Sequence, residues 1–147
     1  MKLSNGQAEE FARIILSGVP LTRAARYFLP PELEPDDVQA EAHGFWGQEE
    51  VQRAMEALTG GVPWQRLSKD ERLQIALDKH YAELAYFLWS TNYSELDGAG
   101  KQKADTCRQA LEAKVAGTAG KGNAMERFYE DLLVAYKKGA VSKIGLA

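Results

Sequence analysis

Residues 7–28 read QAEEFARIILSGVPLTRAARYF, and their pattern predicts how the N-terminal part of the chain folds. Its first half, residues 7–17, carries apolar side chains at helical spacing and predicts a helix that ends at Gly18. The Val19-Pro20 pair then turns the chain, and a short second helix is expected over 23–28. Helix, tight turn and short helix are the first elements of a helix-turn-helix.

Small residues favour close packing of these two helices. Thr22 is a suitable N-cap for the second helix, and the paired alanines Ala24 and Ala25 allow the first helix to approach it closely. Three prolines within residues 30–35 forbid a helix immediately afterwards. Small helical bundles use the same kind of turn, so a bundle that does not contact DNA stays open as an alternative.

Two further helices complete the predicted N-terminal domain, residues 1–62. The third is capped by Asp36 or Asp37 and runs to about Phe45, with a break expected near Gly44 and Gly47. The fourth is expected over 49–58. The third helix is expected to cross the first two and to be presented to a groove of DNA.

The longest predicted helix covers residues 69–91 and begins with a capping box, Ser68 to Glu71. It carries two apolar faces, and such a helix must be covered on two sides. One face suits its own hairpin partner and the other suits a neighbouring subunit. The residues expected to mediate oligomerisation are Leu77, Tyr81, Leu84, Tyr86, Leu88 and Trp89.

The remaining sequence predicts only helices. A loop over 92–100 and a helix over 101–116 would complete an antiparallel helical hairpin, so residues 63–122 are expected to form an oligomerisation domain. Residues 123–147 are expected to hold a last helix, 124–138, and a short basic tail. Strand signals are almost absent, so the predicted class is all-α.

The amino-acid composition limits the classes of protein to which this chain can belong. The chain has 147 residues, of which 45% are hydrophobic and 27% charged, as in an ordinary folded domain. No apolar run is long enough for a membrane span, and the N-terminus lacks the apolar core of a signal peptide. A single cysteine, Cys107, gives neither an internal disulfide nor a zinc set, which indicates a reducing cytoplasm. The net charge is −3, so the chain as a whole does not attract nucleic acid.

The sequence does not predict an enzyme. His43 and His80 lie in different segments, and Cys107 lies on a helical stripe of small residues where a buried structural thiol is expected. The Gly120-Lys121-Gly122 segment lacks the spacing of a phosphate-binding loop. We therefore expect no catalytic residues, no metal and no cofactor.

Four short stretches together resemble the bacteriophage terminase small subunits. They are FARIILSG (11–18), LTRAARY (21–27), DVQAEA (37–42) and EVQRAM (50–55), and the hairpin that follows is similar to the family's oligomerisation domain. The resemblance implies a non-catalytic, homo-oligomeric ring in the host cytoplasm. Such a ring recognises double-stranded viral DNA at the packaging initiation site and regulates the terminase large subunit, which supplies the motor and nuclease.

The third helix departs from what DNA recognition requires. Residues 36–43 carry three acids and no lysine or arginine, whereas duplex DNA presents about one negative charge per 1.7 Å of its axis. Gln39 and His43 lie four residues apart and are candidates for reading base edges. The phosphate contacts are then expected from Lys2, Arg13, Arg23, Arg26 and Arg53, with most weight on Arg23 and Arg26.

Two other functions are consistent with a helix-turn-helix followed by a helical hairpin. A helix-turn-helix transcription regulator would dimerise through the hairpin, and a structural helical adaptor would bind no DNA. The mass of the assembly separates the ring from the dimer, and a DNA-binding measurement separates both from the adaptor.

Overall fold

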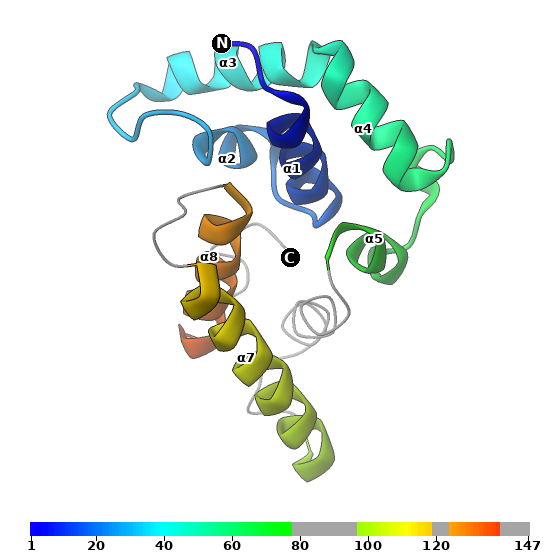
Figure 1. Cartoon of the computed structure of the whole chain (residues 1–147), viewed down its shortest axis with the longest axis vertical. Coiled ribbons are helices and arrows are strands. Elements are labelled where there is room, and N and C mark those ends of the chain that lie inside the picture. Colours follow the sequence, from blue (N-terminus) through cyan, green and yellow to red (C-terminus); the bar gives the residue numbers. More distant parts are fainter. Residues whose placement is uncertain (78–96, 119–123, 139–147) are drawn as a thin grey trace.

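A computed structural model describes residues 1–77, 97–118 and 124–138 of the chain. All regular structure in these ranges is helical, which confirms the all-α prediction. The elements are α1 (Asn5–Leu16), α2 (Leu21–Arg26), α3 (Pro35–Gly47), α4 (Glu49–Thr59), a 3-10 turn (Trp64–Arg66), α5 (Lys69–Ala76), α7 (Gly98–Thr118) and α8 (Ala124–Lys138). Helices α1 to α4 gather at one end of the molecule, and α7 extends away from them (Figure 1).

A capping box starts α1 two residues earlier than the apolar pattern predicts. The Ser4 hydroxyl accepts a hydrogen bond from the Gln7 backbone N–H, and the Gln7 side chain accepts one from the Ser4 N–H. These two bonds satisfy donors that the first turn of a helix otherwise leaves unpaired. The helix ends before Gly18, whose φ of 98° is accessible to glycine at little steric cost.

Two predicted details of α2 and α3 are wrong. Helix α2 covers Leu21–Arg26 and not 23–28, so Pro20 occupies its N-cap position and Thr22 lies inside the helix. Pro35 likewise lies in the first turn of α3. Of the break expected near Gly44 and Gly47, only the second position is correct, since α3 continues through Gly44 and ends at Gly47.

A cluster of aromatic rings forms the centre of the N-terminal core. The Phe11 ring on α1 meets the rings of Phe28 and Phe45 edge to face, at centroid distances of 5.7 and 5.6 Å. Phe11 and Phe45 are fully buried. Burial of each such side chain stabilises the fold by roughly 1.5–3 kcal/mol relative to exposure. These rings tie α3 to α1 and so hold the outer face of α3 in place.

The capping box at Ser68 and Glu71 is confirmed and begins α5. The continuous helix predicted over 69–91 is wrong at its ninth residue, because α5 ends at Ala76 and Leu77 is extended, with φ −126° and ψ 156°. Leu77 is 3% exposed and belongs to the core of this same chain. Tertiary packing therefore overrides helical propensity here, and Leu77 is not available to a neighbouring subunit.

The other predicted oligomerisation residues lie outside the described residues. These are Tyr81, Leu84, Tyr86, Leu88 and Trp89, and His80 and most of the first helix of the predicted hairpin lie there too. The second helix of that hairpin begins at Gly98 instead of 101, because the Asp97 carboxylate accepts a hydrogen bond from the Gly100 N–H at 2.7 Å.

Helix α8 has the bounds that the sequence predicts, and it packs against α1 and α7. Its residues Ala124, Phe128 and Tyr129 belong to the same hydrophobic cluster as the N-terminal helices. Leu73, Ala76 and Leu77 of the α5 region join that cluster as well. The boundary expected after residue 62 therefore falls within a core that includes residues on both sides of it.

Candidate functional site

The outer face of α3 carries the two candidate base-reading side chains. Gln39 and His43 are both exposed, and they lie one helical turn apart. The opposite face of the helix is fully buried through Val38, Ala42 and Phe45. The buried face anchors α3 on the core, so Gln39 and His43 stand on a rigid support and face solvent.

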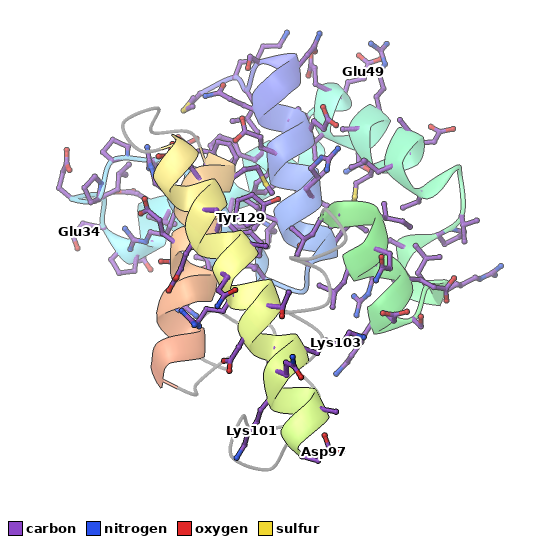
Figure 2. All side chains as sticks on the ribbon, turned by 60° about the horizontal axis from the view of Figure 1, so that its bottom comes forward. Glu34, Glu49, Asp97, Lys101, Lys103 and Tyr129 are labelled. Atoms are coloured by element: carbon purple, nitrogen blue, oxygen red, sulfur yellow. The ribbon has the colours of Figure 1, made fainter. Side chains whose placement is uncertain are left out.

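Acidic residues lie on α3 and at both of its ends in the sequence. Asp36 and Asp37 are exposed in the first turn of α3, where a negative charge is favourable to the helix dipole. Glu34 and Glu49 lie at the periphery of the N-terminal helices, just before and just after α3 in the chain (Figure 2). Along the helix, the Glu41 carboxylate is 3.5 Å from the N-terminal amine of Met1. Helix α3 therefore carries acidic residues and no lysine or arginine, and its Glu41 charge is paired with the N-terminal amine.

Arg23 and Arg26 occupy different environments although both lie on α2. Arg23 is exposed and forms no hydrogen bond or ion pair with any residue in the described ranges. The Arg26 guanidinium instead donates a hydrogen bond to the Leu33 carbonyl at 3.0 Å. Arg26 thereby holds the loop between α2 and α3 against α2, which gives it a structural task.

Lys2 and Arg53 are exposed but paired with acids. The Lys2 ammonium is 3.2 Å from the Glu50 carboxylate, and Arg53 pairs with Glu49 one turn before it on α4. The pKa of the Glu50 carboxyl lies below its ordinary value, first because of a hydrogen bond from a backbone N–H and then because of Lys2. The side chains of Lys2 and Arg53 are 77% and 72% exposed, so solvent screens both pairs strongly.

Arg13 connects α1 to α5. Its guanidinium donates to the Ala76 carbonyl at 3.1 Å and pairs with Glu9 on its own helix at 3.0 Å. The structure therefore does not place all seven predicted residues on one surface. Lys2 lies near the junction of α3 and α4, and Arg23 lies on α2, which is between α3 and α8 in Figure 1.

Gln48 positions the N-terminus, and the sequence reading did not single it out. The residue lies between α3 and α4, where its side-chain oxygen accepts from the Leu3 N–H at 3.0 Å and its side-chain nitrogen donates to the Met1 carbonyl at 2.9 Å. Residues 1–3 are thereby held beside the start of α4. A single glutamine between two helices gives no sequence signal for such a contact over 45 positions.

The sequence reading also missed a polar contact between α2 and α8. The Tyr27 hydroxyl donates a hydrogen bond to the Asp131 carboxylate, 104 positions along the chain. The pKa of Tyr27 lies well above its ordinary value, mainly because the side chain is buried and secondly because of the bond to Asp131. Arg23 opposes this shift through its positive charge.

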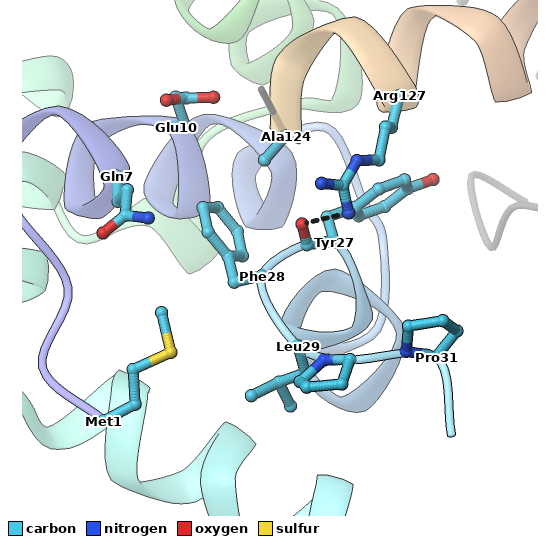
Figure 3. Close-up of a pocket in the computed structure, with 10 residues that line it drawn as sticks. Met1, Gln7, Glu10, Tyr27, Phe28, Leu29, Pro31, Ala124 and Arg127 are labelled. Atoms are coloured by element: carbon cyan, nitrogen blue, oxygen red, sulfur yellow. Dashed lines mark hydrogen bonds between the residues drawn. The ribbon is translucent and has the colours of Figure 1, made fainter. Parts of the chain in front are cut away.

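A cavity of about 520 Å³ lies beside Tyr27, between α1, the loop after α2 and the start of α8 (Figure 3). Phe28, Leu29 and the two prolines of the loop give it an apolar wall. Glu10 and Arg127 also line it, but Glu10 accepts from the Met125 N–H and Arg127 donates to the Tyr27 carbonyl, each at 3.0 Å. Both charged groups thus have structural partners, and the cavity provides no evident acid–base pair.

The described ranges hold neither a cluster of metal ligands nor a helix suited to a membrane. Within residues 1–77, 97–118 and 124–138, no three His, Cys, Asp or Glu side chains gather as metal ligands. None of the helices described there combines the length and apolar character of a membrane span. No protein-family model matches the chain, and no curated protein or solved structure matches it either.

Proposed function

We propose that this chain is a DNA-recognition subunit of the bacteriophage small-terminase type. In this proposal it forms a homo-oligomeric ring, binds double-stranded viral DNA without catalysing a reaction, and passes the DNA to the terminase large subunit. The observation that carries the proposal is the outer face of α3, where Gln39 and His43 are exposed on a helix whose other face is fully buried. Glutamine and histidine side chains can hydrogen-bond base edges in a groove.

The charges around α3 determine how tightly one subunit can bind DNA. Phosphate contacts supply most of the affinity of DNA-binding proteins, and here the exposed cations Lys2 and Arg53 are paired with acids. Arg13 and Arg26 have structural contacts, so Arg23 is the best phosphate-contact candidate among the five. One subunit should therefore bind weakly. Several subunits acting on one duplex can raise the affinity by about 10²–10⁴.

The same pairing of cations favours a second candidate, a helical adaptor that binds proteins and not DNA. An acidic exposed face on α3 suits a basic protein partner at least as well as it suits a duplex. The third candidate, the dimeric transcription regulator, would also bind DNA. It would contain two subunits where the ring contains more, so the mass of the assembly distinguishes the two.

Fluorescence anisotropy of a labelled duplex, titrated at several salt concentrations, tests the proposal. Binding should weaken steeply with salt, and Arg23→Ala should lower affinity for all sequences and reduce the salt slope by about one unit. Gln39→Ala should reduce preference among sequences and spare non-specific binding. Arg66→Ala serves as the control, since it removes an exposed arginine from the 3-10 turn that is not among the five candidates. Absence of binding at low salt would favour the adaptor.

A further inference from the structure

An open apolar pocket lies where the turn between α1 and α2 meets the end of α3 and the 3-10 turn. Its volume is about 460 Å³, a size typical of pockets that hold a ligand or an anchoring side chain. The described residues that form its apolar wall are Ile15, Val19, Pro20, Leu21, Trp46 and Trp64. We call this site the tryptophan groove.

The groove presents apolar surface that the fold leaves partly uncovered. The rings of Trp46 and Trp64 meet edge to face at a centroid distance of 6.5 Å, and both side chains are only partly buried. Val62, two residues before Trp64, is 45% exposed, and within the described ranges only Met1 is another large apolar side chain with such exposure. Apolar patches with tryptophan at their centre are typical of surfaces that bind another protein.

The groove also carries positive charge, although the net charge of the chain is −3. Among the described residues that line it, Arg72 is the charged one, and its guanidinium carbon lies 5.9 Å from the centroid of the Trp64 ring. A second arginine, Arg66, is exposed in the same 3-10 turn as Trp64. The acids that follow in the chain, Asp70 and Glu71, belong to the first turn of α5 and do not line the groove.

This combination defines the chemistry of a complementary partner. An apolar side chain in the groove loses contact with water, which favours its binding. A guanidinium presents N–H donors in a planar fork that fits a carboxylate, and its position against the Trp64 ring is itself favourable. A ligand that places an apolar group next to a carboxylate therefore satisfies both parts of the site.

We propose that the tryptophan groove is a docking site for a peptide segment of a partner protein, in which a large apolar side chain lies next to aspartate or glutamate. The apolar side chain packs against Trp46 and Trp64, and the neighbouring carboxylate pairs with Arg72. This function is separate from DNA recognition, because none of the seven candidate DNA-contact residues lines the groove.

The walls of the groove favour a peptide over a strand of nucleic acid. A nucleobase binds by stacking on an open aromatic face. Here the Trp46 and Trp64 rings meet edge to face, and Arg72 lies over a face of the Trp64 ring. Ile15, Val19 and the other aliphatic residues of the wall offer no stacking surface.

A peptide selection on the full-length protein tests the proposal. Random twelve-residue peptides displayed on phage are selected against the wild type, and the enriched peptide is synthesised with a fluorescent label and titrated by anisotropy. We expect the enriched peptides to share a leucine, phenylalanine or tryptophan within four positions of an aspartate or glutamate.

Variants of the groove should weaken binding of the enriched peptide. We expect Trp64→Ala to weaken it at least about tenfold, the scale of a central aromatic residue in an interface. Arg72→Gln should weaken it about three- to tenfold at low salt and less at high salt, since a partly exposed charge pair is screened. Arg53→Gln removes the same charge from α4, outside the groove, and should change affinity less than about twofold.

A change on the peptide keeps the test independent of how well each variant folds. The enriched peptide is also synthesised with its carboxylates replaced by the corresponding amides. This peptide should bind wild type about three- to tenfold more weakly than the acidic one, and Arg72→Gln should weaken it no further. A further loss would show that Arg72 does not act through the peptide carboxylate, which would overturn the proposed pairing.

Three other results would overturn the proposal. The first is a selection that enriches no peptide, or peptides that bind Trp64→Ala as tightly as wild type. The second is a labelled oligothymidylate that binds wild type and loses affinity in Trp64→Ala, which would make the occupant a nucleic-acid strand. The third is a lower mass of Trp64→Ala in light scattering without peptide, which would make it a second copy of the chain. None of these measurements uses duplex DNA, so the proposed function is tested separately.

Discussion

The Arg13 guanidinium donates a hydrogen bond to the Ala76 carbonyl at 3.1 Å and so joins the last turn of α1 to the end of α5. Carbonyl groups in the last turn of a helix have no partner within it, and a cation at that end is favourable to the helix dipole. Arg13 also pairs with Glu9 at 3.0 Å, which fixes its side chain in this orientation. The arginine therefore stabilises the fold.

Arg13→Ala should lower the free energy of unfolding by about 1–2 kcal/mol, because the Ala76 carbonyl loses a charged hydrogen-bond donor. Urea unfolding followed by circular dichroism measures the change. Arg53→Ala is the matched control, since its ion pair with Glu49 is exposed and should be worth less than about 1 kcal/mol. Equal losses in the two variants would show that the Arg13 contact is not structural.

A glycine-to-alanine substitution should lower the stability of the protein at one position and raise it at another. Gly60 ends α4 with a φ of 65°, so Gly60→Ala should destabilise the protein by about 1 kcal/mol. Gly44 lies inside α3, where an added Cβ would meet nothing within 4 Å, so Gly44→Ala should stabilise it by about 0.5–1 kcal/mol. Thermal melts of both variants check the two signs. A destabilising Gly44→Ala would contradict the helical course of α3 through this residue.

Helix α5 should be sensitive to acid through its capping box. Hydrogen bonds from the Ser68 backbone and hydroxyl hold the pKa of the Glu71 carboxyl below its ordinary value of 4.5. A folded-state pKa below the unfolded value adds stability that is complete above pH 4.5 and is lost as the pH falls through the folded-state value. Glu71→Gln should therefore flatten the acid side of the pH–stability curve. An unchanged acid limb would show that the ionised form of the Glu71 carboxyl contributes nothing to stability, since glutamine can still complete the capping box.

The sequence predicts the local features of the fold well and the long-range ones poorly. The bounds of α8 and the capping box at Ser68 follow from helical spacing and from residues close in the chain. The end of α5 at Ala76 does not, because it depends on burial of Leu77 against residues far away in the sequence. Arginine spacing likewise cannot show whether a guanidinium meets a phosphate or, as for Arg13 and Arg26, a backbone carbonyl.

The predicted oligomerisation surface now depends on residues beyond Leu77, which is buried in the chain's own core. Trp89→Asp and Tyr86→Asp should each reduce the mass of the assembly, because a carboxylate in an apolar subunit interface loses its hydration. Light scattering coupled to size exclusion measures the mass. Gln74→Asp introduces the same charge at an exposed position of α5 and should leave the mass unchanged.

Sedimentation velocity of the protein with a labelled 30-base-pair duplex measures ring assembly and DNA binding in one experiment. We expect a closed homo-oligomer larger than a dimer, with the duplex sedimenting in the same boundary at low salt and separating from it as salt is raised. Monomeric or dimeric protein at micromolar concentration would contradict the ring. Duplex that sediments alone at every salt concentration would contradict DNA recognition.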